Sequence, residues 1–128
     1  MSTAGPGTGS SGPEHDDLKR VREQLGRELT GVACCGAPPD PLPGQVGALD
    51  GFGLQADGRD VRVSVYLYPQ WGDGQEHAGP LLAAAEQSGR YAIVGVNGRM
   101  LFLGTARRDD IESEIVVNDL CSVFSGQE

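Results

Sequence analysis

The three cysteines are the residues of this chain that most invite a chemical interpretation, and two of them are adjacent. Paired zinc ligands normally stand two to four residues apart, so the adjacent Cys34 and Cys35 count against a zinc site. Both cysteine positions follow or end expected helices, which is the wrong pole of the helix dipole for a reactive thiolate. Two interpretations stay open: three reduced thiols packed as small apolar side chains, or a disulfide from Cys34 or Cys35 to Cys121.

A second candidate for chemistry is the segment 68–80, YPQWGDGQEHAGP, which contains the only tryptophan, Trp71. A large aromatic side chain beside convergent polar groups is typical of a small-molecule or peptide pocket. Three of the polar groups are also able to act in acid–base chemistry or to hold a weakly bound metal ion. In the alternative interpretation Trp71 is a lid over the end of the core and its acidic neighbours are solvated. The binding candidates in this segment are Tyr68, Trp71, Asp73, Glu76 and His77.

A third candidate surface is one face of the most clearly predicted strand, 61–68, VRVSVYLY. Its valines and leucine alternate with polar and aromatic residues, so the two sets face opposite sides of a sheet. The second set includes Arg62, Tyr66 and Tyr68, and arginine and tyrosine are enriched at protein interfaces. If no helix covers this face, we expect a partner or homodimer surface; the alternative is that the proline-rich segment lies across it. We identify no catalytic residue and expect no cofactor or resident metal ion.

The elements that must position these residues begin after a tail of small and polar residues, 1–13, which we expect to be disordered. Residues 14–128 then form a single α+β domain. A first helix is predicted because apolar residues recur at helical spacing. Four prolines make the segment 34–53 irregular in this interpretation, before a first strand. The apolar stripe of the first helix consists of Leu18, Val21, Leu25 and Leu29.

The second half of the chain predicts a short helix at 81–89, a hairpin and a final helix. Asn97-Gly98 separates two apolar runs and indicates a type I′ turn, with the hairpin central in the sheet or covered on both faces. The final helix, from Arg108 to about Gly126, has one broad apolar face. Ile111 and Ile115 fall outside that face, so we expect them to meet a second surface.

The order of the expected elements is helix, strand, strand, short helix, strand, strand, helix. Two hairpins in series favour an antiparallel sheet of about four strands, with the N- and C-terminal helices packed on one face. This α+β arrangement supports many functions, so the fold alone implies none.

Composition limits the classes of partner. The formal net charge is −8 and no basic stripe is present, which argues against nucleic acid. No apolar run approaches the length of a membrane span. Nine of the ten basic residues are arginine, which we attribute to a GC-rich bacterial genome. The first residues lack the features of a secretory signal, so we expect a cytoplasmic protein, or a secreted or envelope-anchored one if the sequence is trimmed.

These observations lead to three functional hypotheses. The first is a small, acidic, non-catalytic module that binds a protein partner or forms a homodimer through the Tyr66 face and the Trp71 segment. The second is a small-molecule-binding protein or enzyme with its pocket at Trp71. The third is an exported cell-envelope domain that carries the disulfide to Cys121.

Overall fold

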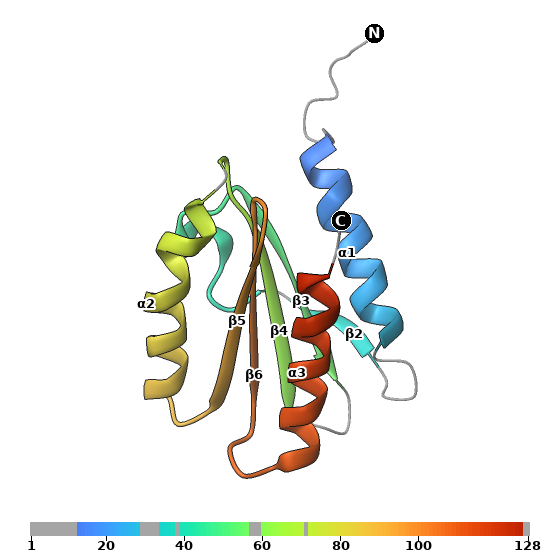
Figure 1. Ribbon diagram of the computed structural model, residues 1–128, viewed down its shortest axis with the longest axis vertical. Helices are drawn as coiled ribbons and strands as arrows, with labels where there is room; N and C mark the ends of the chain where they lie inside the picture. The colour runs from blue at the N-terminus through green and yellow to red at the C-terminus, as the bar shows by residue number, and fades with distance from the viewer. Residues whose placement is uncertain (1–12, 29–33, 38, 57–59, 71, 127–128) are drawn as a thin grey trace, which may run out of the picture.

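A computed structural model describes residues 13–28, 34–37, 39–56, 60–70 and 72–126. Within these residues the chain forms three α-helices and one antiparallel sheet (Figure 1). The elements in chain order are α1 (Pro13–Glu28), β2 (Cys34–Ala37), the 3-10 helix η2 (Pro43–Val46), β3 (Asp50–Ala56), β4 (Val61–Leu67), α2 (Asp73–Gln87), β5 (Tyr91–Asn97), β6 (Met100–Ala106) and α3 (Ile111–Ser125).

The sheet has the strand order β2-β3-β4-β6-β5, and every neighbouring pair is antiparallel. The two predicted hairpins, β3–β4 and β5–β6, lie side by side through the pairing of β4 with β6. The predicted four-stranded α+β sheet is therefore confirmed, and β2 extends it by one short strand.

The expectation that residues 34–53 are irregular is wrong at both ends. Cys34 pairs with Ala56 at the start of β2, and β3 already begins at Asp50. The prolines that suggested a loop begin only after β2, at Pro38. An edge strand needs hydrogen-bond partners on one side only, so four residues are enough to form β2.

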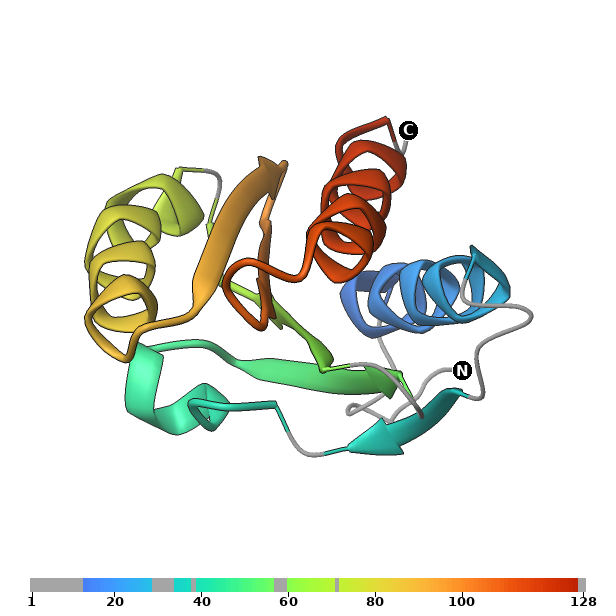
Figure 2. The same ribbon diagram turned by 90° about the horizontal axis from the view of Figure 1, so that it is seen from below.

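Helices α1 and α3 pack on the same face of the sheet, as predicted, and α2 lies on the opposite face (Figure 2). The first face holds the larger core, because the valines of β4 and the apolar stripe of α1 meet there. The predicted stripe positions of α1 are buried at 0–5% exposure where they are described, and Leu29 lies outside the described residues. The buried residues shared by the two helices and the sheet include Leu18, Val21, Leu25, Val63, Val65, Phe102, Val117, Leu120 and Phe124.

The opposite face has a mixed cover. Helix α2 contacts β5 and β6, while η2 and the chain around it lie against the tyrosines of β4. A second buried cluster forms here, and its members are Tyr66, Tyr68, Leu81, Leu101 and Leu103. Helices α2 and α3 contact the hairpin of β5 and β6 from opposite faces, but β5 is an edge strand and its residues stay partly exposed.

Helix α2 is longer than the predicted 81–89 and begins eight residues earlier, at Asp73. The interior Pro80 favoured a later start, since proline removes one backbone hydrogen bond from a helix. Pro80 is exposed, and the residues on either side of it, including Ala78 and Leu81, pack against the second cluster. Tertiary packing thus supports the helix through the proline.

The β5–β6 turn is displaced by one residue from the prediction. Asn97 pairs with Met100, so the two turn residues are Gly98 and Arg99, and only Gly98 has positive φ, at 63°. This is the arrangement of a type II′ turn, which needs glycine at its first central position. Asn97 instead donates a side-chain hydrogen bond to the Phe124 carbonyl, at 2.9 Å.

The two terminal regions differ slightly from the predictions. Residues 1–12 of the predicted tail lie outside the described residues, and Pro13 is the first residue of α1. Helix α3 begins at Ile111, where the Asp110 carboxylate accepts a hydrogen bond from the Ser113 backbone N–H as an N-cap. Ile111 and Ile115 are 68% and 52% exposed, outside the buried face of α3 as predicted.

Candidate functional site

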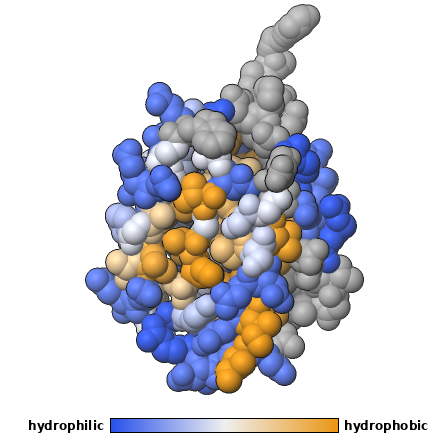
Figure 3. Space-filling view, in the orientation of Figure 1, coloured by the Kyte–Doolittle hydropathy of each residue, from blue (hydrophilic) through white to orange (hydrophobic). Residues whose placement is uncertain are grey.

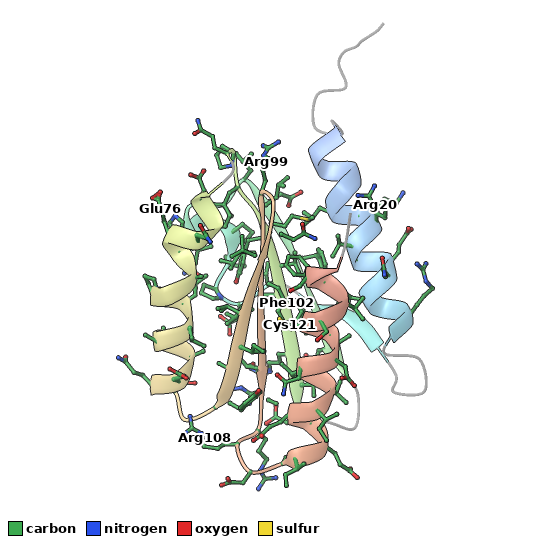
Figure 4. The ribbon with its side chains drawn as sticks, in the orientation of Figure 1. Arg20, Glu76, Arg99, Phe102, Arg108 and Cys121 are labelled. Carbon is green, nitrogen blue, oxygen red and sulfur yellow. The ribbon has the colours of Figure 1, made fainter. Side chains whose placement is uncertain are left out.

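Cys121 is a buried free thiol and not a reactive group. It lies on the side of α3 that faces the sheet, close to Phe102 (Figure 4). Burial raises the pKa of its thiol, which disfavours the thiolate. Its sulfur sits above Gly95 of β5, where an added Cβ would come within 3.0 Å. The thiol therefore serves as a small apolar side chain in the core.

The structure gives no support to a disulfide between Cys121 and the adjacent pair. Cys121 lies over β5, while Cys34 and Cys35 belong to β2 at the other edge of the sheet. Strands are spaced about 4.8 Å apart, so four spacings separate β2 from β5, whereas a disulfide needs Cα atoms within about 7 Å. The side chains of Cys34 and Cys35 lie outside the described residues, and their redox state stays a prediction.

Tyr66 and Tyr68 do not form an open surface. Their exposures are 0% and 1%, so the prediction of a partner-binding face at these tyrosines is wrong. The alternative, in which the proline-rich segment covers them, is correct. The Tyr66 hydroxyl donates to the Pro41 carbonyl at 2.5 Å, and the Tyr68 hydroxyl donates to the Val46 carbonyl at 3.0 Å. Burial raises the pKa of both phenols, to about 12 for Tyr68.

The segment around Trp71 is brought together only in part, and Trp71 itself lies outside the described residues. His77 stacks on Tyr68 with ring centroids 4.9 Å apart and packs against Gly47. The Asp73 carboxylate accepts a hydrogen bond from the Gln70 backbone N–H at the start of α2. Glu76 is exposed on the outer side of α2 (Figure 4). Tyr68, Asp73 and His77 thus have structural partners, and a pocket at Trp71 stays a prediction.

A cavity of about 560 Å³ lies between α2 and the segment 39–42, on the face of the sheet that holds the tyrosines. Its floor is formed by β4 and β6, including Ser64, Leu103 and Thr105. One wall is the small-residue side of α2, including Ala84 and Ala85. The volume is within the range of small-molecule sites. Among the predicted binding residues that the structure describes, only Arg62 lines this cavity.

Arginine side chains gather at one end of this cavity. Arg90 lines it and forms an ion pair with Asp60, at 2.9 Å between Nη1 and Oδ2. The hydrogen bond from Arg90 lowers the pKa of Asp60 against the effect of burial, and the charges of Arg62 and Arg107 act in the same direction. The carboxylate of Asp60 thus contacts Arg90 and feels the charge of two further arginines, in a chain whose net charge is −8.

The edge of the sheet at β5 is the second feature that sequence reasoning missed. All seven residues of β5 are partly exposed, and none of them is charged or proline. Apolar side chains gather over β5 between α2 and α3 (Figure 3). The apolar pattern of 91–97 predicted a covered strand, but it contains no signal for the strand order that leaves one side unpaired.

The described residues contain neither a cluster of side chains that could hold a metal ion nor a membrane-spanning helix. Among the described residues, no three side chains from His, Cys, Asp and Glu come together as a metal site. None of the helices in the described ranges combines the length and the apolar character that a bilayer crossing requires.

No family model matches the chain, and no curated protein and no solved structure matches it.

Proposed function

We propose that this chain is a non-catalytic homodimerising module whose interface is the β5 edge of the sheet. The observation that carries the proposal is a strand of seven uncharged residues at the end of the sheet, whose outer side pairs with no other strand among the described residues. Natural proteins normally protect such an edge with lysine, proline, a bulge or a very short strand. The β5 edge has none of these features, and its pairing with β6 is continuous over all seven residues.

The backbone of β5 presents alternate residues outward. Asn97 and Met100 flank the two-residue turn and form a hydrogen-bonded pair, because residues i and i+3 of such a turn face each other. Hydrogen-bonded and non-hydrogen-bonded pairs then alternate along the strands. Ala92, Val94 and Val96 therefore direct their N–H and C=O groups away from β6 and toward the open edge.

This pattern is complementary to itself. An antiparallel pairing of two β5 strands about a two-fold axis at Val94 places Val94 opposite the same residue of the second copy. Ala92 then faces Val96 of the second copy, so every outward backbone group has a partner. The joined sheet has both α2 helices on one face and both α3 helices on the other.

A second exposed apolar element lies on the same side of the molecule. Figure 3 shows an apolar strip along the lower part of α3, where Ile111 and Ile115 are the strongly exposed apolar residues. Apolar side chains at i and i+4 lie on one face of a helix, so these two form a continuous ridge. This ridge supports an interface that extends beyond the strand itself.

Light scattering after size-exclusion chromatography tests the proposal. We expect the wild-type chain to have twice the mass of one 13.4 kDa chain. The Val94→Pro variant removes an outward N–H without removing a bond to β6, so we expect a folded monomer. The matched Val94→Ala variant loses a similar amount of side chain but keeps the N–H, and we expect it to remain a dimer.

Amide hydrogen exchange gives the second readout. In the dimer the outward amides of Ala92, Val94 and Val96 exchange slowly, whereas at an open edge they exchange fast. A wild-type chain that is monomeric at high concentration, with fast exchange at these three amides, would show that the proposal is wrong.

A further inference from the structure

The cavity between α2 and the segment 39–42 changes from polar to apolar along the strands. Facing residues of neighbouring strands form rows across the sheet. Arg62 faces Gln55 on one side and Thr105 on the other, so the first row is polar. Two residues further along β4, Ser64 faces Leu103. These rows lie about 7 Å apart, because a strand rises about 3.4 Å per residue.

Toward Tyr66 the sheet side of the cavity becomes apolar, although Asp40 of the segment 39–42 also lines the cavity. Tyr66 and Leu101 form the next row beyond Ser64, and both are fully buried. Helix α2 covers the cavity on the side opposite the sheet. Its side chains at the inner part are small or apolar: Leu81, Ala84 and Ala85. The inner part is therefore suited to an apolar group and the outer part to a polar one.

The outer end is positively charged. Arg62 and Arg90 both line it, and Arg90 uses Nη1 and Nη2 for Asp60, which accepts through its carboxylate and its backbone carbonyl. The third nitrogen of Arg90, Nε, is buried and donates to no acceptor among the described residues. The guanidinium of Arg90 is thus held at this end of the cavity by Asp60, and the exposed Arg62 adds a second positive charge there.

We propose that this cavity binds a small monocarboxylate with an apolar tail. The carboxylate lies at the outer row between Arg62 and Arg90, and the tail extends over Ser64 toward Leu103. One negative charge is favoured over two, because Asp60 already neutralises part of the arginine charge. This site is separate from the β5 edge and does not depend on the proposed dimer.

Octanoate and its neutral match octanamide are suitable probes, since they share one tail and differ in charge. We expect octanoate to shift the backbone amide signals of Ser64, Leu103 and Thr105 in an NMR titration of the full chain. Octanamide should bind about tenfold more weakly, because a hydrogen bond to a charged group contributes more than a neutral one. The Arg62→Gln variant should weaken octanoate binding by about the same factor and leave octanamide binding unchanged.

A pair of substitutions on α2 tests the location. Ala84 lines the cavity and Ala83 does not, yet both are exposed alanines of the same helix. We expect Ala84→Phe to abolish octanoate binding and Ala83→Phe to leave it unchanged, with both variants folded by circular dichroism. The proposal is overturned if octanoate causes no shifts, if octanamide binds equally well, or if Ala84→Phe binds octanoate like the wild type.

Discussion

The two faces of the sheet are built differently, although the same strands supply both. On the face toward α1 and α3, two helices cover the sheet with apolar side chains. On the opposite face one helix shares the cover with an irregular segment, and the tyrosines of β4 bind that segment through its carbonyl groups. The first face is closed, and the second holds the cavity.

This difference shows that one face of a sheet can stabilise the fold while the other face holds a cavity. Alternate residues along β4 point to opposite faces, so each face can be specified independently. Helices with apolar stripes fill a surface without gaps, whereas an irregular segment must satisfy its own backbone polar groups. We therefore expect substitutions on the α1–α3 face to change stability strongly, and substitutions on the other face to change it less.

The largest expected effect is that of Phe124→Ala on the α1–α3 face. Phe124 is fully buried, and its ring lies 5.5 Å from that of Phe102. Its removal leaves a cavity, so we expect the free energy of unfolding to fall by about 3–5 kcal/mol in urea titrations. Ser122→Ala, on the exposed side of the same helix and outside the ridge of Ile111 and Ile115, should change it by less than about 0.5 kcal/mol. Equal effects of the two variants would contradict the assignment of the closed face.

A smaller effect is expected for Gly104→Ala on the same face. An added Cβ would lie 2.7 Å from side-chain atoms of both Phe102 and Val117, so these side chains or the backbone must shift. We expect a loss of about 1–3 kcal/mol in the free energy of unfolding. The control is Gly79→Ala in α2, where no atom lies within 4 Å of the new Cβ. This variant should be neutral or more stable, because alanine favours the helix.

The closed face could be predicted from the sequence because its signals are periodic. The helical spacing of Leu18, Val21 and Leu25 and the alternation of 61–68 both indicate which side chains are buried. The opposite face gave no such signal. Its cover is the segment 39–49, whose packing depends on hydrogen bonds from two tyrosines about 20 residues later in the chain.

The two candidate sites could not be predicted for related reasons. The cavity forms where the segment 39–42, α2 and Arg62 lie together in the folded chain. No local sequence pattern predicts that these distant segments are neighbours. The open edge depends on strand order, since the composition of 91–97 is equally suited to a central strand. Arg62 was identified as a candidate from its strand position, but as part of an open face and not as a cavity residue.

Alkaline pH should weaken the tyrosine face. Burial raises the pKa of Tyr68 from 10.0 to about 12, and that of Tyr66 is raised as well. Their contribution is complete below pH 10, and it is lost as the pH rises from 10 toward 12, because the unfolded chain releases these protons first. At about pH 11 we expect a loss of about 1 kcal/mol for each tyrosine in the free energy of unfolding.

Urea titrations between pH 9 and 12, followed together with tyrosinate absorbance, measure this effect. Tyr68→Phe should flatten the alkaline dependence, since phenylalanine has no proton to release. If both tyrosines ionise at their ordinary pKa while the chain stays folded, the described cover of this face is wrong.

Removal of a single hydroxyl on this face should have a smaller effect at neutral pH. Tyr66→Phe leaves the Pro41 carbonyl without its phenol donor but keeps the ring in place. We expect the free energy of unfolding to fall by about 1 kcal/mol. Amides of the covering segment that donate to the sheet, such as that of Asp40 to Ser64 Oγ, should exchange faster. Tyr91→Phe is the control, because its hydroxyl donates to Asn118 on the closed face and not to this segment.

The smallest expected effect concerns the ion pair at the outer end of the cavity. Arg90 lowers the pKa of Asp60 below its ordinary value of 3.8, so the pair stabilises the fold above that pH and loses its contribution as the pH falls below it. The two side chains are 22% and 41% exposed, which limits the contribution to about 0.5 kcal/mol at neutral pH. We expect Asp60→Asn to lower the free energy of unfolding by that amount at pH 7, and the difference from the wild type to disappear near pH 2. A difference that persists at acidic pH would mean that Asp60 acts through packing, and the arginines at this end of the cavity would then be held by other contacts.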